Sequence, residues 1–312
     1  MQRIHIVDTP SAPLLVSGTV AYDDIITPHG SGTRLLGGSA SYAALAASYF
    51  TDTRLEGLVG ADFLERDRER FRIHEVDTTG LRTAGTGDTF FWRGQYHENY
   101  NRRDTLETRL GVNAQPRPAL PPGHATTPYV LLANDAPEFQ LAVLDQLRSP
   151  RFVLADSMNY WIDTARDALL RVIARADLVV VNDSEAVQLS GESNLVLAAR
   201  RLLEMGARAL IVKKGEHGAL LFHTGGLFAL PAWPVTQLYD PTGAGDSFAG
   251  AFMGTLAALQ RTDFAALKLA MLHATAVASL TVEAFSCDRL ERAGAEEIAS
   301  RVAQLREMTR LP

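Results

Sequence analysis

The sequence predicts an α/β fold in which a mostly parallel sheet is covered by helices on both faces. The first observation is a regular rhythm in the second half of the chain, where short runs of Val, Ile and Leu alternate with helical segments. Strands of this composition, separated by helices, are typical of parallel sheets that are buried on both sides. The second observation is that polar side chains follow four of these strands. The predicted strands are 129–134, 152–156, 177–182 and 209–213, and the predicted helices between them are 137–147, 164–174 and 195–203.

The first half of the chain predicts the same core with two β excursions from it. Residues 14–18 and 55–60 have the composition of buried strands, and a helix with apolar residues at helical spacing begins after a glycine pair. Two turn-rich segments, at about 19–36 and 86–113, predict hairpins that leave the main sheet. We expect these two excursions to pair into one small β lid, so that residues 1–312 form a single domain.

Composition excludes several classes of protein. The chain has 312 residues, of which 46% are hydrophobic, and its net charge is -6 with acidic and basic residues interspersed, which argues against a nucleic-acid partner. Its one cysteine, Cys287, rules out an internal disulfide framework and fits a reducing cytoplasm. The N-terminus does not resemble a signal peptide, and no uninterrupted apolar run reaches about 18 residues, so we expect a cytoplasmic protein without a membrane span.

The segment 240–252, D-P-T-G-A-G-D-S-F-A-G-A-F, combines a turn signal, glycines, a carboxylate and the start of a helix. Gly243 and Gly245 allow the backbone to approach a ligand closely. The unpaired N–H groups at the start of a helix form an anion site, and Asp246 lies at that start. A carboxylate beside a bound phosphoryl group can take a proton from the attacking hydroxyl. The alternative is that Asp246 only caps the helix.

Polar clusters follow four predicted strands of the second half of the chain. In a parallel sheet the carboxyl ends of the strands share one edge, and ligands bind there. A single cluster of this kind would be a helix cap, whereas four on one edge favour a ligand site. The clusters are Asn134 with Asp135, Asp156 with Asn159, Asn182 with Glu185, and Lys213 with Lys214 and Gly215.

The G-A-G-D motif with its small-residue helix, late in an α/β chain, resembles the second signature of the ribokinase-like (PfkB) carbohydrate kinases. The resemblance extends over nearly the whole chain and implies a ribokinase-like three-layer sandwich, with a mostly parallel central sheet and a small β lid over the sugar site. In that family the residue matching Asp246 is the catalytic base. The backbone N–H groups matching Gly243, Ala244 and Gly245 form the anion hole.

The resemblance also implies an acceptor site near the N-terminus. Gly37 and Gly38 match a glycine pair that contacts substrate hydroxyls in the first signature of the family. The family usually has Asn four residues after the second glycine, where this chain has Tyr42. Asp23 matches a carboxylate that binds sugar hydroxyls, and a carboxylate can accept hydrogen bonds from two vicinal hydroxyls. From the residues alone, Asp23 could also be an exposed hairpin residue, and Asp24 is a competitor for the role.

The nucleotide side is implied by two further motifs. N-D-S-E resembles the N-x-x-E motif of the family, in which Asn182 and Glu185 would organise Mg²⁺ and phosphate. The same spacing fits a capping box at a helix start, and the residues alone leave both interpretations open. V-K-K-G-E-H-G resembles a nucleotide-contacting strand–turn–strand with Gly215 and Gly218 in place. Lys213 stands where the family often has Thr or Ser.

These features predict a kinase that moves the γ-phosphoryl group of ATP to a hydroxymethyl group of a sugar or nucleoside. The chain has no G-x-x-x-x-G-K-[ST] motif, so a P-loop enzyme is excluded. The resemblance implies ATP and Mg²⁺ as cofactors and associates Asp240 with a monovalent cation. It also implies that exposed lid edges can pair two copies into a homodimer. Arg93, Arg102 and Arg103 are candidates to reach an anionic group from the lid, and the alternative is that at least two of them only decorate the surface.

Two other functions compete with this prediction. A non-catalytic module that binds nucleotide or sugar on the same scaffold would explain the departures at Tyr42 and Lys213, but it has no need of a base at Asp246. A dinucleotide-dependent oxidoreductase requires G-x-G-x-x-G in the first βαβ unit with an acidic residue about 20 positions later. The glycine turn of this chain comes late, which excludes that class.

Overall fold

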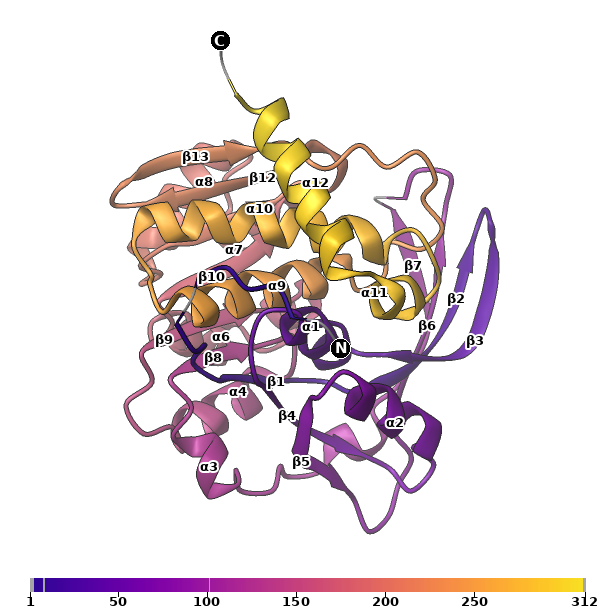
Figure 1. The fold of residues 1–312 in the computed structure, drawn as a ribbon. Helices are drawn as coiled ribbons and strands as arrows, with labels where there is room; N and C mark the ends of the chain where they lie inside the picture. Colours follow the sequence, from indigo (N-terminus) through magenta and orange to yellow (C-terminus); the bar gives the residue numbers. More distant parts are fainter. Residues whose placement is uncertain (1–2, 8, 101, 311–312) are drawn as a thin grey trace.

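The computed structural model describes residues 3–7, 9–100 and 102–310, and within them it contains one large sheet, one small sheet and the helices that cover them (Figure 1). The large sheet has nine strands in the described residues. In spatial order they are β13 (Gly226–Leu230), β12 (Ala219–His223), β11 (Leu210–Lys213), β10 (Leu178–Asn182), β9 (Phe152–Asp156), β8 (Tyr129–Leu132), β1 (Leu14–Ser17), β4 (Thr53–Val59) and β5 (Asp77–Thr83).

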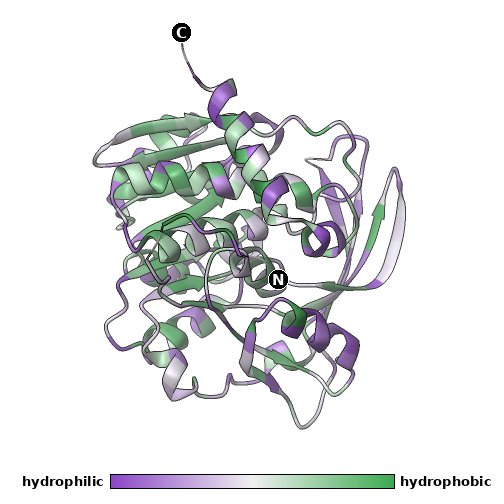
Figure 2. Cartoon of the chain, viewed as in Figure 1, coloured by the Kyte–Doolittle hydropathy of each residue, from purple (hydrophilic) through white to green (hydrophobic). Residues whose placement is uncertain are grey.

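The large sheet is parallel from β5 to β11, and its last two strands, β12 and β13, are antiparallel. The central strands are buried along their whole length; the four residues of β1 and the four of β8 are all buried. Apolar strands of this kind need cover on both faces. Figure 2 shows the strands of the large sheet mostly in hydrophobic colours and α2 mostly in hydrophilic ones. The predicted mostly parallel sheet is confirmed.

Two separate cores, one on each face of the sheet, make the fold a three-layer sandwich. One core packs under α1 (Ser39–Ser48), α9 (Ala244–Leu259), α10 (Phe264–Thr281) and α12 (Ala295–Met308). The other packs under α4 (Pro137–Leu144), α6 (Arg166–Ile173), α7 (Asp183–Ser190) and α8 (Leu195–Glu204). The remaining helices are α2 (Glu65–Ile73), α3 (Pro122–Ala125), α5 (Asn159–Thr164), α11 (Asp288–Arg292) and two 3₁₀ turns, η1 (Gly111–Ala114) and η2 (Gly215–His217).

The small sheet stands at one side of the large one (Figure 1). Its strands, in spatial order, are β3 (Gly30–Gly37), β2 (Ala21–Thr27), β6 (Phe90–Tyr96) and β7 (Arg103–Arg109). The β2–β3 and β6–β7 pairs are antiparallel hairpins, and β2 pairs in parallel with β6, so that Asp23 lies opposite Trp92. The small β sheet expected for the fold class is therefore present.

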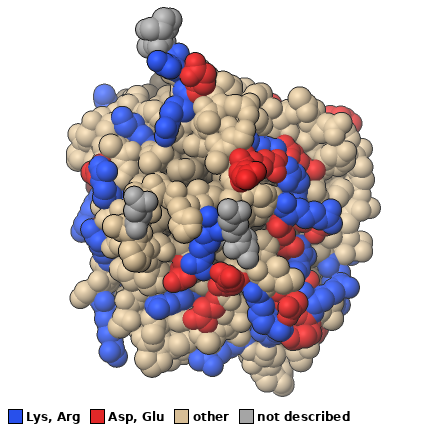
Figure 3. Space-filling view, viewed as in Figure 1, with Lys and Arg blue, Asp and Glu red and all other residues tan. Residues whose placement is uncertain are grey.

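One helix of the described residues, α10, is long and apolar enough by length and composition to span a membrane, and 67% of it is buried inside the protein. His273 on this helix packs against Phe50, and burial lowers the pKa of the imidazole to about 4. On the face drawn in Figure 3, acidic and basic side chains intermix without a large patch of one sign. These features are those of a core helix and of a surface with mixed charge.

Candidate active site

The loop before α9 leaves main-chain N–H groups free at the edge of the large sheet. Gly243 is the N-cap and has φ 77, a left-handed conformation that favours glycine. The Ala244 N–H donates to the Pro241 carbonyl at 3.3 Å, which closes the turn. Within the described residues, the N–H groups of Gly243, Gly245 and Asp246 donate to no main-chain acceptor. The structure thus departs from the predicted donor set at Ala244, whose N–H is used by the turn, and adds the N–H of Asp246.

Asp246 is the third residue of α9 and not its cap, so the capping interpretation is wrong. Its half-buried carboxylate has no hydrogen bond to another side chain in the described part of the chain. Burial raises the pKa of Asp246 to about 6, the charge of Asp156 adds to the rise, and Lys213 and Arg103 oppose it. A carboxylate with such a pKa is ionised at neutral pH and is still a usable base.

Lys213, the last residue of β11, brings an ammonium group to the same loop. Its Nζ lies 3.2 Å from Oδ2 of Asp156. A Cβ atom added to Gly245 would stand 2.9 Å from the same Nζ. Burial lowers the pKa of Lys213, but the charges of Asp156, Glu185 and Asp246 outweigh it and raise the pKa overall. The lysine is therefore a fixed cation beside the free N–H groups.

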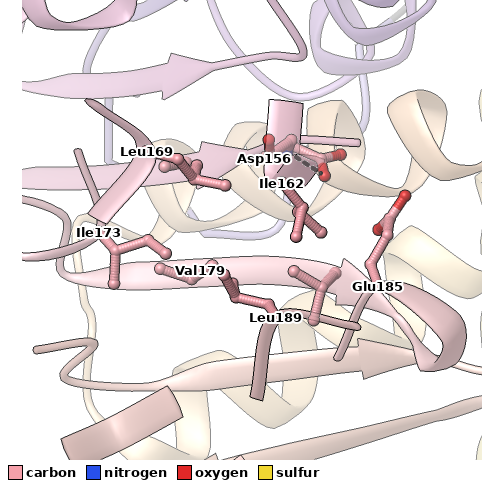
Figure 4. Close-up of a pocket in the computed structure, with 10 residues that line it drawn as sticks. Asp156, Ile162, Leu169, Ile173, Val179, Glu185 and Leu189 are labelled. Carbon is pink, nitrogen blue, oxygen red and sulfur yellow. Dashed lines mark hydrogen bonds between the residues drawn. The ribbon is translucent and has the colours of Figure 1, made fainter. Parts of the chain in front are cut away.

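Asn182 and Glu185 form the capping box of α7. The Asn182 side chain accepts from the Glu185 N–H at 2.8 Å, and Oε2 of Glu185 accepts from the Asn182 N–H at 2.8 Å. Burial raises the pKa of Glu185 to about 7, against the influence of Lys213. In Figure 4 the carboxylates of Asp156 and Glu185 lie at one end of a small hollow whose other lining side chains are apolar except for Ser157. Its volume of about 10 Å³ leaves room for about one water.

Asp23 faces the site from the small sheet. A Cβ atom added to Gly37 would stand 2.0 Å from Oδ2 of Asp23, so this close approach requires glycine. Burial raises the pKa of Asp23 to about 8, the charges of Asp240 and Asp246 add to the rise, and the hydrogen bond from the Gly38 N–H opposes it. Asp23 is 4% exposed, so it is not an exposed hairpin residue.

Asp24 points away from Asp23 and is used in the small sheet itself. Its Oδ2 pairs with NH2 of Arg93 at 2.6 Å, and its Oδ1 accepts from the Arg34 N–H at 2.8 Å. Of the two neighbouring carboxylates, only Asp23 lies near Asp240 and Asp246.

Tyr42, on α1, lies under the turn and not in the open part of the site. It is 1% exposed, and its ring lies where a side chain of Gly243 would be, with a Cβ atom there only 2.3 Å from Cδ1. Its hydroxyl has no hydrogen-bond partner in the described residues. The ring therefore supports the left-handed turn at Gly243 from below.

Arg103, on β7, reaches the site from the small sheet, and sequence analysis did not single it out from its neighbours. Burial lowers the pKa of Arg103, but a hydrogen bond to Tyr96 and the charges of Glu185 and Asp246 raise it overall. Its guanidinium lies 5.5 Å from the ring centre of Trp92. The Thr242 hydroxyl donates to the Tyr96 hydroxyl at 3.1 Å, which ties the small sheet to the turn before α9.

The remaining predicted residues lie at the margins of this cluster. Gly215 and Gly218 shape the turn after β11, where the Lys214 N–H donates to the Gly218 carbonyl at 2.7 Å. Asp240 is fully buried and accepts from the Thr242 N–H at 2.9 Å and the Ser286 N–H at 3.3 Å. Burial raises the pKa of Asp240 to about 6.

The arrangement combines a base, main-chain donors and a cation at the ligand edge of an α/β sheet. A family model described as pfkB family carbohydrate kinase matches residues 131–292, which is more than half of the chain. The chain belongs to the pfkB family of carbohydrate kinases. The matched segment includes the whole of the cluster on β9, β10, β11 and α9, while the small sheet lies outside it.

Individual members of the family are similar over most or part of this kinase. It is 28% identical to the cytidine kinase of Thermococcus kodakarensis over 245 residues, which cover 77% of this chain and 87% of that protein. It is 35% identical to the aminoimidazole riboside kinase of Salmonella typhimurium over 122 residues, or 39% of this chain and 38% of that protein. A ribokinase of Cryptococcus neoformans in complex with ADP has the same fold, with a TM-score of 0.77 at 22% identity over 93% of this chain and 100% of that one.

The residues fit Mg²⁺ held mainly by phosphate and water. No group of three or more His, Cys, Asp or Glu that could hold a metal ion occurs in the described ranges. Both oxygens of Asp156 are engaged, Oδ1 by the Ser157 N–H and Oδ2 by Lys213. The capping box occupies Oε2 of Glu185 and leaves Oε1 as the carboxylate oxygen available to a metal. Mg²⁺ near nucleotides is commonly held by one or two carboxylates and the phosphates themselves. The site therefore suits a metal that arrives with the nucleotide.

Proposed function

We propose that this kinase transfers the γ-phosphoryl group of ATP to a hydroxymethyl group of a sugar or nucleoside, with Asp246 as the general base. The carboxylate takes the proton of the hydroxyl, the oxygen forms a bond to the γ-phosphorus, and the bond from phosphorus to ADP breaks. The observation that carries the proposal is the position of Asp246, an ionised carboxylate beside the N–H groups of Gly243 and Gly245, which donate to no main-chain acceptor in the described residues. Phosphoryl transfer depends mostly on positioning and charge stabilisation, which these groups supply.

The acceptor side of the proposal consists of Asp23, Gly37 and Gly38. Asp23 accepts hydrogen bonds from sugar hydroxyls, and the glycines let the sugar approach the backbone at the start of α1. Burial raises the pKa of Asp23 to about 8, and hydrogen bonds from bound sugar hydroxyls would lower it by stabilising the ionised carboxylate. Tyr42 contributes indirectly, since its ring supports the turn at Gly243.

The donor side consists of Lys213, Arg103 and the free N–H groups of the loop before α9. Lys213 and Arg103 approach Asp246 from two different parts of the fold, and each carries a fixed positive charge. Together they would neutralise the γ-phosphoryl oxygens on both sides of the group being transferred. Gly215 and Gly218 would let the nucleotide lie close to the turn after β11, and Asn182 would hold Glu185 in place.

Two ions belong to the proposal. Mg²⁺ would be held by the phosphates with help from Glu185, and it supplies charge neutralisation on the nucleotide. A monovalent cation would be associated with Asp240, whose buried carboxylate has a pKa raised to about 6 and no basic partner in the described residues. We assign proton removal to Asp246 and binding of the transferred phosphoryl group to its neighbours, and we assign neither step to an ion.

The small sheet is the proposed lid of the acceptor site. Support comes from Asp23, Trp92 and Arg103, which lie on its face toward the large sheet, and from the bond between Tyr96 and Thr242. Its outer strands, β3 and β7, have no further strand partner in the described part of the chain. Pairing of two copies through these edges is the proposed mode of dimerisation, and sedimentation over a range of protein concentrations tests it.

The deciding experiment incubates purified protein with Mg-ATP and a panel of sugars and nucleosides, and measures ADP and phosphorylated product together. We expect phosphorylation of a hydroxymethyl group in one of the two classes. Binding of nucleotide and acceptor without any turnover would support the competing non-catalytic module. Product formed at the wild-type rate by Asp246→Asn would overturn the assigned base.

A further inference from the structure

A cavity of about 250 Å³ lies on the face of the small sheet that is turned away from Asp23. Side chains alternate between the two faces of a strand. Tyr22 precedes Asp23 on β2, and Phe91 precedes Trp92 on β6, so both rings belong to the opposite face. These two rings line the cavity together with Arg34 and Arg109 from the edge strands. The volume is slightly below the range of about 300–1,000 Å³ that is usual for small-molecule pockets.

Arg34 is held in the cavity wall by several independent contacts. Its guanidinium lies 4.7 Å from the ring centre of Tyr22, and its NH2 group donates to the Asp62 carbonyl at 2.8 Å. Its own N–H donates to Asp24, and its φ of 49 is a left-handed conformation that is strained for arginine. Strain of this kind persists where the surroundings determine the conformation, and it is common at ligand sites. Tyr22 is fixed in turn by its hydroxyl, which donates to Asp67 at 2.7 Å.

The cavity has more free hydrogen-bond donors than acceptors. Arg109 stacks on Phe91, with its guanidinium carbon 4.0 Å from the ring centre, and donates from NH1 to Glu107. The other N–H groups of its guanidinium have no protein partner among the described residues. A guanidinium carries five N–H donors. The Asp62 carboxylate is already satisfied, because its Oδ1 accepts from both the N–H and the hydroxyl of Thr89 at 2.7 Å and its Oδ2 pairs with NH2 of Arg34 at 3.5 Å. Asp88 is the one further carboxylate of the wall, and it is exposed.

We propose that this cavity binds a small anionic metabolite, with a carboxylate or phosphate group on the two guanidinium groups and a flat apolar body on the two rings. Stacked arginines with free donors recognise anions of this geometry. This ligand is distinct from the acceptor and from the nucleotide, because Tyr22 and Asp23 lie on opposite faces of the same strand. The proposed function does not require this cavity, so binding at the cavity and phosphoryl transfer can be tested separately.

The cavity connects the small sheet to the body of the protein. Four of its side chains come from the small sheet, and Asp62 comes from the segment between β4 and α2. A ligand that contacts both parts favours the arrangement in which the small sheet lies against the body. The size of this shift is set by how much more tightly the ligand binds that arrangement than one in which the sheet lies further away. Because Asp23 lies on that sheet, we expect the ligand to lower the KM for the acceptor and to leave the KM for ATP unchanged.

The test measures binding of phenyl phosphate, benzoate and inorganic phosphate to the full-length protein by calorimetry, with an ATP analogue present to fill the nucleotide site. We expect phenyl phosphate and benzoate to bind, and Arg109→Gln to weaken that binding at least tenfold. Asp88→Asn should tighten it several-fold, because the variant removes a negative charge from the wall. Arg82→Gln, at an exposed arginine of β5 outside the cavity, is the matched control and should change nothing.

Four results would overturn the proposal. The first is that no probe binds, and the second is that Arg109→Gln binds as tightly as the parent protein. The third is that Asp88→Asn weakens binding, which would indicate a cationic ligand. Binding abolished by Lys213→Met would place the anion in the active site and would count against the cavity as well. A protein that binds the probes but phosphorylates nothing would refute the proposed function alone, whereas binding with no change in acceptor KM would refute the coupling.

Discussion

Nζ of Lys213 lies so close to Gly245 that a single added Cβ atom there would stand 2.9 Å from it. This relationship sets the side chain at the end of β11 against the main-chain donors at the start of α9. The ion pair with Asp156 at 3.2 Å keeps the ammonium group in that position. A phosphoryl group bound by the loop would therefore be in contact with a positive charge from the moment it arrives.

Lys213→Met is expected to lower kcat by about 10–1,000-fold, since it removes a charge from the transition state. The variant should also raise the apparent pKa of the acid limb of the rate profile, because Lys213 lowers the pKa of Asp246. Lys214→Met is the control, since Lys214 is half-buried like Lys213 and has no ion pair with Asp156 among the described residues. Steady-state rates over a pH series check both effects, and a slow variant with an unchanged acid limb would contradict the assigned charge interaction.

Asp246→Asn is expected to lower kcat by about 100–10,000-fold, the usual contribution of a general base. Binding of the ATP analogue and of the acceptor should remain within a few-fold, because asparagine keeps the size of the side chain. Asp167→Asn offers a matched control, since Asp167 is an exposed carboxylate in the first turn of α6. Calorimetric binding with rate measurements separates loss of chemistry from loss of fold.

The pH dependence of kcat/KM follows from the raised pKa values of the site carboxylates. Proton removal requires the ionised form of Asp246, whose pKa is about 6, so kcat/KM should fall about tenfold per pH unit below that value. Acceptor binding requires the ionised form of Asp23, whose pKa is about 8, so kcat/KM should continue to rise toward mildly alkaline pH. The observed values belong to the coupled set of carboxylates and not to one residue. A profile that is flat between about pH 5 and 8 would rule out this assignment.

Gly37→Ala is expected to raise the KM for the acceptor more than tenfold and to leave the KM for ATP unchanged. The new methyl group would lie 2.0 Å from Oδ2 of Asp23, so the carboxylate must move. Gly85→Ala is the control, because a Cβ atom there meets nothing within 4 Å. Equal effects of the two variants on acceptor KM would show that the Asp23 carboxylate does not hold the substrate.

Asp23→Asn should weaken acceptor binding and stabilise the free protein at the same time. The pKa of Asp23 is about 8 in the folded protein and about 3.9 when unfolded, so its contribution to the free energy of unfolding is lost as pH rises between these values. We expect the variant to raise Tm by roughly 2 °C at pH 8, corresponding to about 1 kcal/mol, with a smaller difference at pH 5. Asp24→Asn should instead lower Tm, because Asp24 pairs with Arg93. Calorimetric scans at the two pH values measure the differences.

The predictable part of this protein is the part whose signals are local. Apolar strands alone predict the alternation of strands and helices. Residues adjacent in the chain predict the helix after Gly37 and Gly38 and the glycine turn before α9. The position of Glu185 at the ligand edge follows from the end of β10 in the same way. The two interpretations of Glu185, as part of a capping box and as a residue that organises Mg²⁺, are compatible. The capping box holds the carboxylate by one oxygen and leaves the other free.

The less predictable part depends on register and on packing between distant segments. A β-bulge between Arg93 and Gly94 shifts the pairing of β6 with β7, so counting alternate residues does not tell which arginine of the hairpin faces Asp246. The structure directs Arg93 to Asp24 and Arg103 toward the site. Tyr42 is a similar case, because its place under Gly243 depends on how α1 meets the loop before α9.

The hydrogen bond between the Thr242 and Tyr96 hydroxyl groups has a consequence for how the enzyme treats water. Thr242 directly precedes Gly243, so this contact joins the small sheet, the proposed lid of the acceptor site, to the turn that would receive the phosphoryl group. An outward movement of the small sheet would break this contact and remove a support from the turn. We therefore expect the enzyme to be a poor catalyst of ATP hydrolysis by water whenever the small sheet is displaced.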